Sequence, residues 1–488
     1  MDSGVLLIVL LVYFALLMFI SLKTSKGANS HTFYIANKQS KWYLVAFGMV
    51  GTSLSGVTFI SVPGWVQSTQ FSYLAMVIGY IVGYFAIAFI LLPVYYKLKL
   101  PSIYSYLYDR FGTYSYKTGA IFFIISRTLG TAFRMFIVVK VLQIFVFDKL
   151  NISFSLTTLI FLILIILYTY RGGVKTLVYT DTLQTLGMIL AVIITIYFIL
   201  NELNISLIDA IREVHQNGYD KWFYIDDLSD KKHFLKQFLA GMFITLTMTG
   251  LDQEMMQKNL SCKNIKEARK NIITYSFIIA FVNLMFLFLG ALLLIYAQSK
   301  GIILPEKTDD IYPVIALNYI GGFLSIIFLL GIISAAFPSA DGALTSLTTI
   351  FSIDILEINK KFNDEQKLKK IRYFIHLCFA LLLYFIVVLF SKINNEAVIS
   401  ELFTVAGYTY GPLLGLYAYG LLTKKALVDT LTPFVAVLSP VVCYLLNKYS
   451  VQLFGGYKFG FEIILLNGFL TFSLLALFAL KYKTKKIT

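Results

Sequence analysis

Long apolar segments separated by short polar loops run along the whole chain. About 20 consecutive apolar residues cross a bilayer as an α-helix, and by that measure the sequence predicts about 13 spans. We therefore expect an all-α polytopic membrane protein. The predicted spans are 4–22, 43–66, 72–96, 119–147, 154–170, 174–200, 237–257, 272–298, 321–353, 373–391, 399–422, 428–446 and 459–480.

Two of the predicted spans are interrupted by small and polar residues at membrane depth. The first interruption covers residues 51–58 and the second covers residues 245–254. A helix that unwinds there frees backbone groups that lipid cannot satisfy, so each segment must be buried in protein or face a water-filled cavity. Free carbonyl oxygens suit a small cation. Paired interruptions in matching places of two halves are the best sequence indication of a transporter's binding site.

The interrupted spans begin two sets of five spans each. Because five is an odd number, the second set enters the membrane from the opposite side, and the two repeats are inverted. We expect one membrane transporter domain made of a leading helix with an inner loop, a first repeat, an outer loop, a second repeat, and two trailing helices with a basic tail. The boundaries of these parts are 1–42, 43–200, 201–236, 237–422 and 423–488.

The formal net charge of +15 is a topology signal, since 58% of the residues are hydrophobic and 14% are charged. Most Lys and Arg side chains fall in alternate loops and in the C-terminal tail, which the positive-inside rule assigns to the cytoplasm. The sequence thus predicts a multi-pass protein of the cell membrane (inner or plasma membrane), with the N-terminus outside and the C-terminus cytoplasmic. The basic tail can meet anionic lipid headgroups of the bilayer. A nucleic-acid partner is disfavoured because no folded basic docking face is indicated.

The three cysteines and four histidines are scattered along the chain. They show no metal-ligand spacing and supply no central base for catalysis. We therefore expect a protein that is not an enzyme and assign it no catalytic residue. No obligate protein partner is evident either.

Several motifs resemble the sodium:solute symporter family over nearly the whole chain. The most specific is residues 171–184, RGGVKTLVYTDTLQ, which is similar to the family's Gly-Gly, Thr-Asp and Gln signature. The resemblance implies a LeuT-like fold and symport of a small organic solute with sodium ion by alternating access. Supporting motifs are residues 33–36 (FYIA), 63–64 (PG), 250–253 (GLDQ), 257 (Q) and 335–345.

The resemblance implies a main sodium site between the first interruption and the span 321–353. Carried over by position, the ligands are the carbonyls of Gly51, Leu54 and Ala336 and the hydroxyl of Ser339. The adjoining family position is usually Ser or Thr but is Ala340 here, which puts one sodium ligand in doubt.

Two carboxylates lie near this implied site. A carboxylate within a span costs at least ~2.5 kcal/mol and so normally faces the bundle interior. Asp341 is therefore expected either to take part in cation binding or to hydrogen-bond within the bundle. Asp181 occupies a position that holds a second sodium in some family members; the alternative is that it pairs with Arg127 or caps backbone groups.

The small hydroxyls of Ser53, Ser55 and Thr58 line the first interruption and are candidate solute ligands. Phe243 and Met248, in the second interrupted span, are candidate apolar walls of the same site.

Arg134 lies near the middle of the span 119–147. A guanidinium binds a carboxylate through two parallel hydrogen bonds, and the segment 132–136 resembles the sialic acid branch of the family. This favours a carboxylate-bearing solute, such as sialic acid, another organic acid or an amino acid. The alternative is that Arg134 pairs with a protein acid such as Asp252 or Glu254, or extends its charged end toward the membrane surface.

Three other functions remain open at this point. The chain could be a sodium-coupled sugar or polyol symporter, a proton-coupled carrier of the same fold, or a solute sensor that does not transport.

Overall fold

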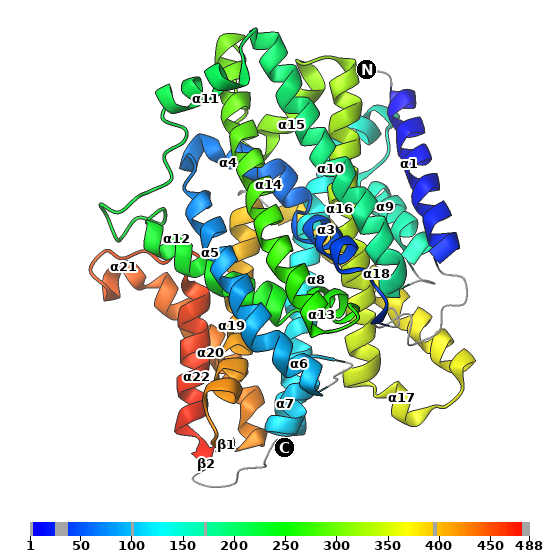
Figure 1. Ribbon diagram of the computed structural model, residues 1–488, viewed down its shortest axis with the longest axis vertical. Coiled ribbons are helices and arrows are strands. Elements are labelled where there is room, and N and C mark those ends of the chain that lie inside the picture. The colour runs from blue at the N-terminus through cyan, green and yellow to red at the C-terminus, as the bar shows by residue number, and fades with distance from the viewer. Residues whose placement is uncertain (1–2, 25–37, 99–101, 170–172, 394–397, 481–488) are drawn as a thin grey trace.

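The computed structural model describes residues 3–24, 38–98, 102–169, 173–393 and 398–480. These residues form long helices that run roughly along one axis of the molecule (Figure 1). The start of α1 (Ser3–Thr24) lies at the same end as α11 (Leu207–Gln216), and the end of the described chain lies at the opposite end. We call these the α11 end and the opposite end.

The helices of the predicted first repeat follow α1. They are α3 (Trp42–Ser53), α4 (Gly56–Thr69), α5 (Tyr73–Ala86), η2 (Ile87–Leu91), α6 (Leu92–Leu98), α7 (Ser105–Arg110), α8 (Thr113–Leu142), η3 (Gln143–Phe147), η4 (Asp148–Leu150), α9 (Phe154–Thr169) and α10 (Gly173–Leu203).

The helices of the predicted second repeat follow α11. They are α12 (Phe234–Thr245), η5 (Leu246–Gly250), α13 (Gln253–Leu260), α14 (Ile265–Ser299), η6 (Thr308–Asp310), α15 (Ile311–Asn318), α16 (Gly322–Ile350), η7 (Phe351–Ile355), α17 (Ile358–Lys361), α18 (Glu365–Ile393) and α19 (Val398–Leu422).

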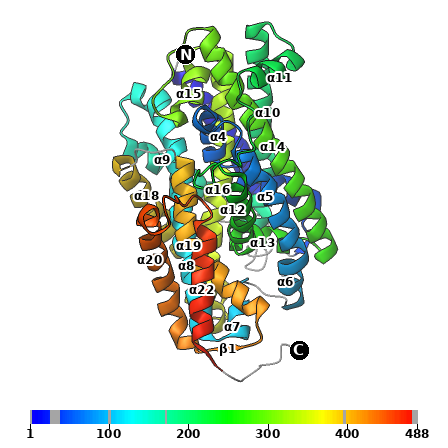
Figure 2. The same cartoon turned by 90° about the vertical axis from the view of Figure 1, so that its left-hand side faces the viewer.

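The trailing part packs on α19 along one side of the bundle (Figure 2). Its two short strands pair antiparallel, with Ala426 opposite Leu480. The elements are β1 (Ala426–Leu427), η8 (Asp429–Leu431), α20 (Thr432–Lys448), α21 (Ser450–Leu453), α22 (Ile463–Leu477) and β2 (Ala479–Leu480).

Among the described residues, 8 helices are long and apolar enough to cross a membrane, and up to 10 if each of two bent pairs counts as one span. Two shorter apolar helices, Phe154–Thr169 and Ile463–Leu477, coincide with further predicted spans. The all-α membrane architecture is confirmed, whereas the number of 13 spans stays a prediction.

The first interrupted span is broken where the sequence predicts. The helices α3 and α4 meet at an angle of 59°. The last bond of α3 runs from the Leu54 N–H to the Val50 carbonyl at 2.8 Å, and the next bond runs from the Phe59 N–H to the Ser55 carbonyl at 3.0 Å. The carbonyls between Gly51 and Leu54 therefore lie outside the regular hydrogen-bond ladder of the described backbone.

The second interrupted span is broken in the matching place, with an angle of 66° between the segment 234–250 and α13. The π-helix η5 ends at the Leu251 N–H, which donates to the Leu246 carbonyl at 3.0 Å. Asp252 then caps α13, because its Oδ1 accepts the Met255 N–H at 3.2 Å. A capping aspartate both begins a new helix and satisfies one of its free donors.

The helices α3, α10 and α16 pack against one another at the centre of the bundle. Gly51 permits the close approach of α3 to α10, since a Cβ atom there would lie 2.3 Å from the Thr185 Oγ1. The first break therefore faces α16 across a tightly packed junction.

Candidate functional site

A cavity of about 80 Å³ lies beside both breaks. Ser53, Ser55, Thr58, Arg134 and Met248 line it, as the sequence predicts for a solute site. Phe243 is half-buried and does not line this cavity; Ile244 and Thr245, one and two residues further along α12, do so instead.

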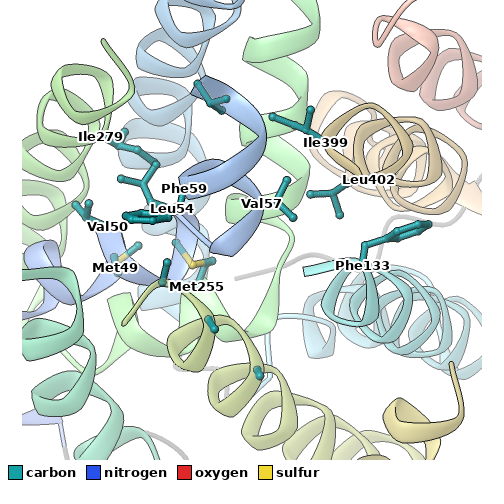
Figure 3. Packing of buried hydrophobic residues seen from close by; sticks show 14 of the residues in the cluster. Met49, Val50, Leu54, Val57, Phe59, Phe133, Met255, Ile279, Ile399 and Leu402 are labelled. Atoms are coloured by element: carbon teal, nitrogen blue, oxygen red, sulfur yellow. The ribbon is translucent and has the colours of Figure 1, made fainter. Parts of the chain in front are cut away.

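Apolar side chains form the wall of this cavity on the α19 side. Figure 3 shows Val57 of α4 pointing toward Ile399 and Leu402 of α19. Met255, at the start of α13, and Leu54 pack in the same cluster. The polar lining is thus set into a closely packed apolar surround, as in many small-molecule sites.

Hydroxyl groups dominate the opposite wall. Tyr73, Tyr80 and Tyr84 of α5 line the cavity. The Tyr73 and Tyr80 hydroxyls lie 3.0 Å apart, and the Tyr84 hydroxyl lies 3.0 Å from that of Tyr275. Tyr275 also hydrogen-bonds the Ser53 hydroxyl, which ties this wall to the first break.

Residues of α4, α8, η3 and η6 line a larger cavity of about 670 Å³. An aromatic cluster of Trp65, Tyr73, Phe403 and Phe461 borders both cavities. Ring centroids of Trp65 and Tyr73 lie 5.9 Å apart, and those of Phe403 and Phe461 lie 5.2 Å apart. Because Trp65 lines the larger cavity and Tyr73 and Phe403 line the smaller one, this cluster lies between the two cavities.

The implied sodium ligands come from α3 and α16, which the fold brings together. Gly51, Leu54, Ala336 and Ser339 are all buried. The Ser339 hydroxyl donates to the Ala336 carbonyl at 2.9 Å. A hydroxyl that donates its hydrogen keeps its lone pairs free, so this geometry suits an oxygen ligand for a hard cation.

Asp181 does not bond to Arg127. Its Oδ2 lies 2.6 Å from the Lys258 Nζ and accepts the Thr52 hydroxyl at 3.2 Å, so the partner of this aspartate is a lysine of α13. Arg127 instead forms ion pairs with Glu254 and, at 3.6 Å, with Asp252. Tyr410 of α19 donates to the same Asp252 Oδ2 at 2.8 Å.

Arg134 forms no ion pair with any carboxylate in the part of the chain that the structure describes. Its side chain is buried, with 7% of its surface exposed, and its Nε lacks a hydrogen-bond partner. The protein acids that could have neutralised it, Asp252 and Glu254, are bonded to Arg127. The guanidinium therefore faces the cavity without an anionic partner.

Asp341 is fully buried on α16. Its Oδ2 accepts the Tyr168 hydroxyl at 2.5 Å, and its Oδ1 has no hydrogen-bond partner. One oxygen of this carboxylate thus has a structural partner, and the other is left free to accept.

A family model described as the sodium:solute symporter family matches residues 33–432. The chain belongs to this family. It is therefore a multi-pass membrane protein that couples the transport of a small organic solute to sodium ion. The inverted repeats and broken spans described above are consistent with a LeuT-like fold.

Matches to named relatives cover most of the chain. It is 26% identical over 443 residues to the "Sodium/sialic acid symporter NanT" of Aliivibrio fischeri (strain ATCC 700601 / ES114), covering 88% of this chain and 85% of that one. It is 24% identical over 420 residues to the "Sodium/sialic acid symporter SiaT" of Proteus mirabilis (strain HI4320), covering 82% and 81%.

Solved structures share the fold. A sodium-coupled sialic acid symporter in a substrate-bound, outward-open state has a TM-score of 0.86 at 18% identity, and the match covers 100% of both chains. Mhp1, a transporter of the nucleobase-cation-symport-1 family, has a TM-score of 0.57 at 12% identity and covers 92% of this chain and 93% of that one.

The sequence did not predict the contacts of Lys258, Tyr168 or Arg127. Lys258 falls one residue beyond the predicted span 237–257. A local signal was available, because Glu254 and Lys258 are four residues apart, the spacing of an ion pair on one helix face. The contacts of Arg127 and Tyr168 join distant parts of the chain and leave no local pattern.

Proposed function

We propose that this symporter imports a solute that carries one carboxylate and several hydroxyls, of which sialic acid is the first candidate, together with sodium. The observation that carries the proposal is Arg134: a buried guanidinium, without a carboxylate partner among the described residues, in the wall of a cavity. Burying an unpaired charge is costly. A solute carboxylate would remove that cost and would gain bidentate hydrogen bonds.

The hydroxyl-rich wall supports the second half of the proposal. Ser53, Ser55 and Thr58 lie at the first break, and Tyr73, Tyr80 and Tyr84 stand on α5. Such groups both donate and accept hydrogen bonds, which matches a polyhydroxylated acid better than an aliphatic one. The two bacterial relatives are sodium/sialic acid symporters, which favours the same class of solute.

The proposed route runs from the larger cavity to the smaller cavity. At about 80 Å³ the smaller cavity lies well below the ~300–1,000 Å³ of typical small-molecule sites. A sugar acid requires more space, so the aromatic cluster of Trp65, Tyr73, Phe403 and Phe461 must move apart to admit it. Closure of this cluster over the solute would then separate it from the outer solution.

The proposed sodium ligands are the carbonyls of Gly51, Leu54 and Ala336 and the hydroxyl of Ser339, with Asp341 as an auxiliary carboxylate. A cation there would hold the broken α3–α4 span against α16 and so order the solute cavity beside the break. By linkage, the solute then raises sodium affinity by the factor by which sodium raises solute affinity. We place the N-terminus outside and the basic C-terminus in the cytoplasm. The proposal is transport without chemical conversion of the solute.

The experiment is a thermal-shift titration of the purified protein in detergent. Sialic acid is tested with two ligands of one ring type, glucuronate and its neutral counterpart glucose, in sodium chloride and in choline chloride. We expect stabilisation by sialic acid, and by glucuronate more weakly, in sodium only. Arg134→Gln should weaken the response to acids by about tenfold or more, a change of about 1.4 kcal/mol, and should retain the response to sodium alone.

The outcomes separate the alternative functions. Stabilisation by glucose with none by either acid contradicts the anionic solute and favours a sugar symporter. Equal stabilisation by acids in sodium and choline contradicts sodium coupling and favours a proton-coupled carrier. Solute binding without counterflow in proteoliposomes contradicts transport and favours a sensor.

A further inference from the structure

Lys258 is a lysine in the interior of the bundle. Its side chain is 2% exposed. Its Nζ meets three oxygens: the Thr52 Oγ1 at 2.5 Å, the Asp181 Oδ2 at 2.6 Å and the Glu254 Oε1 at 3.3 Å. An ammonium has three hydrogens to donate, and each has one acceptor here.

The three oxygens come from the elements that surround the first break. Thr52 lies in the last turn of α3, directly after Gly51, whose carbonyl is a proposed sodium ligand. Asp181 lies on α10, and Glu254 lies on α13, one turn before Lys258 itself. A single nitrogen thus joins α3 and α13, one half of each broken span, to α10.

A cage of one hydroxyl and two carboxylate oxygens in the bundle interior is also a place where a monovalent metal cation would bind, because hard cations prefer oxygen ligands. Lys258 fills this cage with a cation that is part of the chain. The Asp181 Oδ1 has no hydrogen-bond partner, so its carboxylate keeps one free oxygen beside the lysine.

The charges in this region depend on Lys258. Among the side chains joined by ion pairs, Asp181, Asp252 and Glu254 supply three carboxylates and Arg127 and Lys258 supply two cations, so the ionised network has a net charge of −1. Without the lysine charge the same groups carry −2. Removing one partner of a buried ion pair leaves a strongly unfavourable charge that an added cation can relieve.

We propose that Lys258 acts as a tethered cation that occupies the Asp181 carboxylate permanently, so that the protein binds one sodium ion and not two. Lys258 is in this sense a residue that sets the ion stoichiometry. The proposal rests on sodium as the coupled ion and is independent of the identity of the solute.

The test is a sodium titration of the purified protein without solute, with equilibrium binding of radioactive sodium as the readout. The parent is expected to bind one ion per chain. Lys258→Met is expected to bind a second ion, with the binding ratio rising from one to two. Lys258→Arg keeps the charge and should stay at one. Lys117→Met, which removes a lysine paired with Glu357 at the opposite end of the bundle, is the matched control and should also stay at one.

Lys258→Met leaves the Asp181 carboxylate unpaired, which lowers stability, so a second variant removes that charge as well. Lys258→Met combined with Asp181→Asn should bind one ion, because the Asp181 charge that would hold the second ion is gone. Two ions bound to the parent, or one ion bound to a folded Lys258→Met, would overturn the proposal. Because the assay contains no solute, a wrong solute class leaves this result unchanged, whereas failure of the parent to bind any sodium would refute the sodium coupling in the proposed function.

Discussion

Arg127 of α8 is bonded to Glu254 of α13, the second half of the second broken span, and both side chains are buried. This ion pair fastens α13 to a helix of the other repeat. A carrier that works by alternating access must be closed on one side while it is open on the other. We expect contacts between the repeats, such as this pair, to stabilise one of these two states.

The Arg127–Glu254 pair predicts non-additive stability effects. Arg127→Met and Glu254→Gln should each lower the melting temperature strongly, because breaking a buried pair from one side costs about 3–5 kcal/mol. The double variant should lose clearly less than the sum of the two single losses. Thermal unfolding of the four proteins in detergent measures this, and strictly additive losses would show that the two charges do not stabilise each other.

Substitutions at the neighbouring residues Ser339 and Ala340 should change sodium affinity in opposite directions. Ser339→Ala removes a proposed ligand and should raise the sodium concentration for half-maximal stabilisation by about tenfold. Ala340→Ser adds a hydroxyl beside the site and should lower that concentration.

A matched control lies on the same helix. Ser346 bonds to the Ala343 carbonyl at 3.0 Å as Ser339 bonds to Ala336, but it lies ~10 Å further along α16. Ser346→Ala should leave sodium affinity unchanged. Equal losses in Ser339→Ala and Ser346→Ala would point to a general effect on the helix and against the proposed ligand.

Variants of Asp341 and Tyr168 distinguish a role of the Asp341 carboxylate in cation binding from a role in stabilising the fold. Asp341→Asn keeps the size of the side chain but removes the charge, and we expect it to weaken sodium binding, since its Oδ1 is free to accept. Tyr168→Phe removes the hydrogen bond to Oδ2 and should lower the melting temperature while sodium still binds. An Asp341→Asn protein with the sodium affinity of the parent would assign this carboxylate a structural role only.

The close contact between Gly64 and η6 predicts that adding a side chain at Gly64 destabilises the protein. A Cβ atom at Gly64 would lie 1.9 Å from the backbone oxygen of Thr308, so Gly64→Ala must displace η6 from α4 and should lower the melting temperature. Gly130, within α8, is the control, because its Cβ would lie 3.6 Å from Leu402, an ordinary contact. Gly130→Ala should be neutral or stabilise by up to ~1 kcal/mol. Equal melting temperatures for both variants would contradict the close approach.

The breaks could be predicted from the sequence because their cause is local. Small residues and hydroxyls at 51–58 and a helix-capping aspartate at 252 are the residues that end and begin helices, and the observed breaks fall within the two predicted segments. The same segment predicted that the hydroxyls of Ser53, Ser55 and Thr58 line a cavity. Phe243 does not line the cavity. The rotation of α12 about its own axis decides which of several neighbouring residues faces the cavity, and the sequence does not determine that rotation.

The pairing of the buried charges could not be predicted, because it depends on which helices meet. The sequence offered Arg127 and Arg134 on one helix and several acids elsewhere, with no means of matching them. In the structure Asp252 and Glu254 form ion pairs with Arg127, and Arg134 is left to the cavity. The lysine that bonds to Asp181 likewise reaches it only because α13 turns inward after the break.

Uptake of labelled sialic acid into proteoliposomes, with sodium or choline outside and sodium-free buffer inside, tests the central claim most directly. The account predicts accumulation above the external concentration in sodium, none in choline, and loss of this uptake in Arg134→Gln. Uptake that is the same in sodium and choline, or that persists at the parent rate without the Arg134 guanidinium, would contradict it.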